Sequence, residues 1–211
     1  ANANAISIDS KEINFGQGSS VQVGPGAYTV SLSKEIDGEL TELSSPVSFN
    51  VVPLQKGTLD GAEPAEVVAF WKELQNLWAD VSAANIDLSN SMKTVKAMEL
   101  AFSRSTSSNE GLVSELNQLR QELLDIEVQF SGNKSKEEIG EKNNPTIYSR
   151  LQFAQMAVSN STYGPTETAK QDLGIAKKQF QKVQSELNAI TNQKIPELEK
   201  KLAEAGAPVV K

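Results

Sequence analysis

The sequence predicts an α+β protein in two parts. A small antiparallel β-sandwich-like segment is expected over residues 1–58, and an elongated antiparallel bundle of about four helices over residues 63–206. Before residue 60 the chain is rich in β-branched residues, Gly and Ser, with short apolar alternations that are typical of strands. After it, Ala, Leu, Glu, Lys and Gln dominate, and apolar residues recur at steps of three and four, which is typical of packed helices.

Apolar alternation along the first part predicts about five strands. The alternating positions are Ile6 and Ile8, Ile13 and Phe15, Val21 and Val23, then Tyr28, Val30 and Leu32, and finally Val47, Phe49 and Val51. The Asp37-Gly38 dipeptide favours a type I′ hairpin, because that turn needs two positive φ angles. A complete immunoglobulin-type sandwich needs roughly 100 residues and seven strands. The segment is therefore expected to be small, incomplete, or completed by sequence outside this chain.

The first helix is predicted to begin at Pro64, a residue suited to a first turn, and to end before a connection at 105–109. Its predicted seam steps by three and four through Trp71, Leu74, Trp78, Val81, Asn85, Leu88, Met92, Val95, Glu99 and Phe102. The residues that widen this stripe are Phe70, Leu77, Ala84 and Met98. Asn85 is expected to be a buried polar residue that sets the packing register.

The remaining helices follow the same periodicity. The second carries Leu112, Leu116, Leu119, Leu123, Ile126 and Phe130, with Gly132 as its stop. Residues 133–144 are expected to be a loop. Asn144 and Pro145 are the predicted N-cap and first-turn residues of a third helix with Ile147, Leu151, Ala154 and Val158. The fourth carries Leu173, Ala176, Phe180, Val183, Leu187 and Ile190, and its seam restarts at Ile195.

The step of five from Ile190 to Ile195, beside Pro196, predicts a kink or break in the last helix. Helix lengths of roughly 55–60 Å follow for the first and last helices at 1.5 Å per residue. Because short connections make neighbouring helices antiparallel, the third helix is expected to run outward and the fourth to return. This topology places four helices in the far half and the C-terminus near the β segment.

Composition excludes several classes of function. The chain carries a net charge of −7 and contains neither Cys nor His. Nucleic acid demands clustered Lys and Arg, and Cys or His zinc sites and Ser-His-Asp triads cannot form. Acidic pairs such as Glu137-Glu138 lie in polar stretches, where nothing places them across a cleft. We predict no catalytic, cofactor-binding or metal-binding residues, and no membrane insertion, since no apolar run reaches ~20 residues.

Four residues are candidates for contact with a ligand or partner. Tyr28, Tyr148 and Tyr163 could present aromatic rings to a carbohydrate, and Arg150 follows Tyr148 closely enough for a cation–aromatic contact. Trp71 and Trp78 lie in the predicted seam, which favours a packing role for both.

Several segments, taken in order, resemble a known family. Residues 24–32 (GPGAYTVSL) resemble a PGxYxVxL strand of immunoglobulin-like modules, and 47–54 resemble the last strand of that unit. The other similar segments are 70–74, 141–151, 163–166, 195–198 and 203–208. This order is similar to the C-terminal region of large bacterial sortilin-like, BNR-repeat propeller proteins that are labelled glycosyl hydrolases. The resemblance covers nearly the whole chain, but no Ser-x-Asp-x-Gly-x-Thr-Trp propeller repeat is present.

The resemblance implies a function without catalysis in this chain, because any hydrolase activity of the family would reside in the propeller. It implies an exported bacterial parent protein that is periplasmic, secreted or on the cell surface. The expected partner is an adjacent propeller domain of the same protein, or another protein, and the expected role is that of an accessory interaction module. The alternative is a carbohydrate-binding module that uses the exposed aromatic residues.

Overall fold

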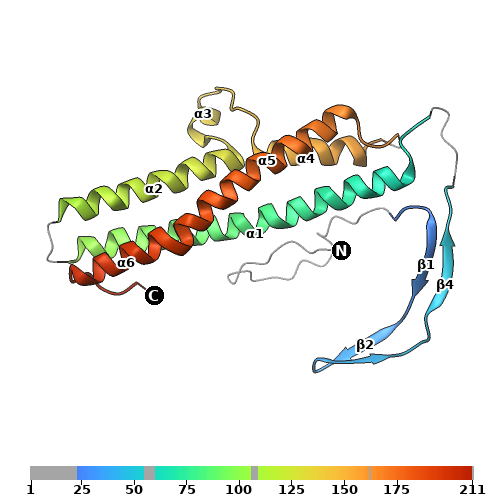
Figure 1. Cartoon of the computed structure of the whole chain (residues 1–211), viewed down its shortest axis with the longest axis horizontal. Helices are drawn as coiled ribbons and strands as arrows, with labels where there is room; N and C mark the ends of the chain where they lie inside the picture. The colour runs from blue at the N-terminus through green and yellow to red at the C-terminus, as the bar shows by residue number, and fades with distance from the viewer. Residues whose placement is uncertain (1–22, 55–59, 106–108, 162, 211) are drawn as a thin grey trace.

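The computed structural model describes residues 23–54, 60–105, 109–161 and 163–210. An antiparallel β segment is followed by a helical region, which confirms the predicted α+β class. In Figure 1 the β segment extends as a long ribbon from one end of an elongated helical bundle. The strand positions predicted between Ile6 and Val21 lie outside the described residues.

The ribbon consists of two antiparallel ladders that follow one another along its length (Figure 1). Its strands are β1 (Gly26–Val30), β2 (Ser33–Ile36), β3 (Glu39–Glu42) and β4 (Val47–Val51). β1 pairs with β4 and β2 with β3, and the Leu43 amide donates to the Leu32 carbonyl, at 2.7 Å, between the ladders. Asp37 and Gly38 have φ angles of 53° and 82°, as the predicted type I′ turn requires.

The long helices pack side by side in one elongated bundle (Figure 1). Its elements are α1 (Pro64–Ser103), α2 (Glu110–Ser131), α3 (Lys134–Glu138), α4 (Ile147–Ser159), α5 (Glu167–Ala189), the π-helical turn η1 (Ile190–Lys194) and α6 (Ile195–Glu204). α1 spans the full length. α2 and α4 lie end to end on one side, and α5, η1 and α6 make a continuous third rod.

The predicted topology of the last two helices is wrong. α4 continues toward the β ribbon instead of turning outward, so α5 and α6 run away from the ribbon and the C-terminus lies at the far end (Figure 1). The reason is the long connection 132–146, which contains the short helix α3 where a loop was expected. The antiparallel rule holds for short connections, and this connection is long enough to let the chain resume its previous direction.

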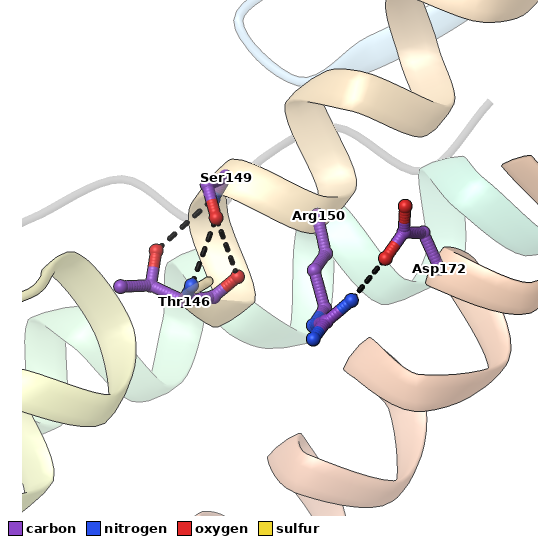
Figure 2. Close-up of polar contacts among 4 residues, drawn as sticks. All are labelled: Thr146, Ser149, Arg150 and Asp172. Carbon is purple, nitrogen blue, oxygen red and sulfur yellow. Dashed lines mark hydrogen bonds and ion pairs between the residues drawn. The ribbon is translucent and has the colours of Figure 1, made fainter. Parts of the chain in front are cut away.

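The start of α4 also differs from the prediction. Its N-cap is Thr146, not Asn144, and Pro145 precedes the helix. The Thr146 hydroxyl accepts from the Ser149 amide at 3.1 Å, and the Ser149 hydroxyl accepts from the Thr146 amide at 2.8 Å (Figure 2). This reciprocal capping box satisfies two backbone donors that an uncapped helix would leave unpaired.

The predicted interruption of the last helix is present as a π-helical turn rather than a break. The Ile195 amide donates to the carbonyl five residues earlier, at Ile190, so this turn is wider than an α-helical one, and both Ile side chains are buried. Pro196 follows directly. Because Pro lacks an N–H and its ring clashes with the preceding carbonyl of an α-helix, the wider turn removes both conflicts and keeps the rod continuous.

The core is formed by apolar side chains from every long helix. Its most deeply buried large members are Phe130, Leu74, Leu88, Met98, Leu123, Ile147, Leu151, Leu187, Val81, Val95 and Val183. The prediction that Asn85 is buried is wrong, since it is exposed. The buried polar residue of α1 is Ser91, whose hydroxyl pairs with that of Thr191 in η1 at 3.2 Å. Leu77 and Met98, which the sequence pattern places at the edge of the apolar stripe of α1, are buried in the core.

Candidate interaction surface

The β1–β4 ladder of the ribbon has one apolar face and one polar face. The cross-strand pairs Val30–Val47 and Tyr28–Phe49 share a face, because residues directly opposite in a ladder point to the same side. Val30 is 56% exposed, Val47 61% and Phe49 47%. The opposite face carries the pair Thr29–Ser48. An amphipathic face of this kind normally packs on a core, and here it is open to solvent.

The edges and the tip of the ribbon are accessible as well. Each ladder has two strands within the described residues, so each strand presents one edge whose backbone groups are available for pairing. The tip, formed by β2 and β3, carries Glu35, Asp37, Glu39 and Glu42 against a single cation, Lys34. The ribbon therefore combines an apolar face near the bundle with an acidic tip.

Glycine residues allow the base of the ribbon to lie against the bundle end. A Cβ on Gly24 would be 2.8 Å from a methyl of Val68 in α1. The Tyr28 hydroxyl donates to the Gly24 carbonyl at 2.8 Å, which fastens β1 to this junction.

The segment entering α1 is held by the α4–α5 turn. The Ala62 amide donates to the Tyr163 carbonyl at 2.8 Å, and a Cβ on Gly61 would lie 3.0 Å from the Tyr163 backbone. Gly164, with φ of 88°, has no room for a side chain beside Ala62. The direction in which the chain enters the bundle is thus set by backbone contacts.

The predicted contact residues Tyr148 and Arg150 are partly buried within the bundle. The Tyr148 ring lies 5.7 Å from that of Trp78 and 5.9 Å from that of Phe130, and burial raises the pKa of its hydroxyl. Arg150 forms an ion pair with Asp172 of α5 (Figure 2), and both side chains are about one-fifth exposed or less. Both residues therefore join α4 to its neighbouring helices, Tyr148 by ring contacts and Arg150 by the ion pair.

The four candidate residues do not come together in one site. Tyr28 is half-buried and stacks on Phe49 with centroids 6.0 Å apart, and Tyr163 is 44% exposed at the α4–α5 turn. The open face of Val30, Val47 and Phe49 is not evident as a surface from the sequence. Alternation predicts which side chains share a face, but whether that face is covered depends on tertiary contacts.

The acidic residues of the described ranges form no metal centre: no cluster of three or more Asp or Glu there could hold an ion. None of the described helices is long and apolar enough to cross a bilayer. Comparison with models of known protein families, with curated proteins and with solved structures finds no match to this chain. The surface of the molecule is therefore the basis for assigning a function.

Proposed function

We propose that this chain is a non-catalytic interaction module in which the β ribbon docks onto a β-rich domain and the bundle acts as a stiff spacer. The observation that carries the proposal is the exposed apolar face of Val30, Val47 and Phe49. Isolated two-stranded ribbons are marginally stable in water, and covering an apolar face releases about 25 cal/mol per Å². A ribbon of this composition gains most of its stability from a partner.

The proposed partner is a propeller domain of a larger exported polypeptide, as the family resemblance of residues 24–32 and 47–54 implies. A β-rich partner suits the ribbon, because a sheet can pair with the available edge of β1 or β4 while its side chains cover the apolar face. The extracytoplasmic location is part of this proposal.

The bundle supports the spacer role. Ion pairs join its rods at successive levels, including Lys170–Glu66 and Lys177–Glu73 between α5 and α1, each at 2.6 Å. Exposed pairs of this type add little stability, but they favour one axial register of the rods.

Docking is preferred over carbohydrate binding because the rings of Tyr28 and Tyr148 are occupied by aromatic neighbours.

The experiment begins with the reading frame upstream of Ala1. If the frame encodes the β-rich propeller that the proposal expects, that domain is expressed separately and its binding to this chain is measured by calorimetry. Phe49→Asp should weaken the affinity by about tenfold or more, since a charge then faces the apolar contact. Ser48→Asp is the matched control, because Ser48 is adjacent but lies on the polar face. Absence of a β-rich domain upstream, or equal loss in both variants, contradicts the proposal.

A further inference from the structure

The dipeptide Asp-Gly occurs twice in the chain, in two different structural settings. Asp37-Gly38 forms the turn between β2 and β3 at the tip of the ribbon, and Asp60-Gly61 lies where the chain enters the bundle. All four residues are exposed. Because the two dipeptides are chemically identical, a difference in their reactivity would come from the structure around them.

An Asp-Gly dipeptide can rearrange without an enzyme. The glycine nitrogen attacks the side-chain carboxyl carbon of the aspartate, a C–N bond forms, and the carboxyl OH leaves with the amide proton as water. The product is a five-membered succinimide. Water then adds to one of the two carbonyl carbons and breaks its bond to nitrogen. Opening at the side-chain carbonyl restores aspartate, and opening at the main-chain carbonyl gives isoaspartate.

The local structure controls how fast the succinimide forms. Glycine favours the ring, because it has no Cβ to obstruct the attack. Ring closure also requires rotation about the main chain of the aspartate, and a folded segment permits that rotation only when it opens. The free energy of local opening ranges from near zero at loosely held segments to that of global unfolding in a core. The dipeptide in the more easily opened segment should therefore react faster.

The tip of the ribbon opens easily. The β2–β3 ladder has four residue pairs, and every residue of both strands is exposed, so little apolar burial opposes opening. Two-stranded ribbons are marginally stable in water. Asp37 has a φ angle of 53°, which is unfavourable for a residue with a Cβ, and a Cβ on Gly38 would meet nothing within 4 Å.

The second dipeptide is held against the bundle. A Cβ on Gly61 would lie 3.0 Å from the backbone of Tyr163, and the next amide, that of Ala62, donates to the Tyr163 carbonyl at 2.8 Å. Gly164 approaches Ala62 closely from the same turn. Rotation at Asp60 would displace Gly61 from these contacts, so its opening is opposed.

We propose that Asp37 is a site of spontaneous modification at which the ribbon tip converts to isoaspartate, while Asp60 reacts far more slowly. The product adds one methylene to the main chain of a two-residue turn. The register that pairs Ile36 with Glu39 does not accommodate this insertion, so the β2–β3 ladder separates. The apolar face of Val30, Val47 and Phe49 lies on the other ladder and is retained. The modification is independent of any partner.

The test follows the oxygen atom that each ring opening takes from water. The whole chain is incubated in water labelled with heavy oxygen, returned to ordinary water and digested with trypsin. Cleavage after Lys34, Lys56 and Lys72 yields peptides 35–56 and 57–72, each with a single Asp. Label uptake at Asp37 should be at least about tenfold faster than at Asp60, because the two segments differ in the free energy of opening. Electron-transfer fragmentation identifies the isoaspartate.

Three controls separate structure from intrinsic chemistry. In guanidinium chloride both dipeptides should take up label at equal rates, since no folded contact remains. Asp37→Glu keeps the charge but would need a six-membered ring, so uptake in peptide 35–56 should cease. Gly164→Ala places a Cβ 2.6 Å from that of Ala62 and should accelerate uptake at Asp60, with circular dichroism melts to establish that the variant is folded.

Two outcomes in the native chain overturn the proposal: uptake at Asp60 that equals or exceeds uptake at Asp37, or no uptake at Asp37 under conditions in which the denatured chain reacts. In the aged protein, amide hydrogen exchange should accelerate in Ser33–Ile36 and Glu39–Glu42 and stay unchanged in Val47–Val51. Unchanged exchange in β2 and β3 after isoaspartate has formed would refute the separation of that ladder.

Discussion

The bundle and the ribbon use apolar residues in opposite ways. In the bundle, Leu123 and Leu151 are at most 1% exposed, because each long helix buries an apolar stripe against the others. In the ribbon, Val47 is 61% exposed and Leu40 is 70% exposed, although both regions have regular backbone hydrogen bonding. The difference teaches that hydrogen-bonded secondary structure does not by itself create a core. The bundle has an apolar core, whereas the apolar side chains of the ribbon remain exposed.

The largest expected effect is at the centre of the bundle. Leu123→Ala should lower the free energy of unfolding by about 2–5 kcal/mol, because it removes a buried side chain and leaves a cavity. Val47→Ala on the ribbon should change it by less than about 0.5 kcal/mol. Urea melts followed by circular dichroism at 222 nm measure both. Equal losses would mean that the ribbon shares the core of the bundle.

Deletion of Asn192 should convert the π-helical turn into an α-helical one. The seam from Ile190 to Ile195 would keep its face, but Pro196 would then clash with a carbonyl of the preceding turn, at a cost of about 3 kcal/mol. Combining the deletion with Pro196→Ala should restore most of that loss. Thermal melts of the three proteins test this, and a stable single deletion would show that proline is not the reason for the wide turn.

Two ion pairs allow burial to be compared within the bundle. Asp172→Ala leaves Arg150 without its partner in a largely buried place, so a loss of about 1–3 kcal/mol is expected. Glu73→Ala breaks the pair with Lys177, whose side chains are nearly half exposed, and should cost less than about 1 kcal/mol. Denaturant melts give the two values, and the reverse order would refute the assignment of Arg150 to the interior.

A substitution in the turn of the ribbon should act on the ribbon alone. Gly38→Ala places a side chain at a φ angle of 82°, which should destabilise the β2–β3 ladder by about 1 kcal/mol. Amide hydrogen exchange should accelerate in Ser33–Glu42 and stay unchanged in α1. Gly140→Ala, also at positive φ in an open position, is the control for strain elsewhere. Faster exchange throughout α1 would indicate one cooperative unit.

The smallest expected effect concerns alkaline pH. Burial raises the pKa of Tyr148 above its ordinary value near 10, so folding favours the neutral phenol. The stabilisation that this preference gives the folded state is fully present below pH 10 and is lost as the pH rises through the folded-state pKa of Tyr148. Tyr148→Phe should therefore lose less stability above pH 10 than the native chain. The pKa of Lys170 is raised by hydrogen bonds to Glu167 and Glu66. Its effect on stability at alkaline pH is the same in the native chain and in Tyr148→Phe, so it cancels in the comparison. Parallel pH profiles would contradict this prediction.

Local chemistry predicted several elements correctly. The Asp37-Gly38 turn follows from backbone preference, and the start of α1 at Pro64 follows from the tolerance of a first turn for proline. The step of five at Ile190 revealed an irregularity, because heptad spacing is a property of one helix. The direction of α4 and the exposure of Asn85 did not follow, since both depend on which helices lie opposite.

By itself, the sequence determined that strands precede helices, the turn of the ribbon and the apolar stripe of each long helix, because these arise from neighbours along the chain. Tertiary structure decided that α2 and α4 share one rod, that Leu77 and Met98 are buried in the core, and that the ribbon face of Val30, Val47 and Phe49 stays open. The physical reason is that burial is a relation between distant segments. Sequence periodicity predicts the side of an element to which a side chain points, but its contacts depend on tertiary packing.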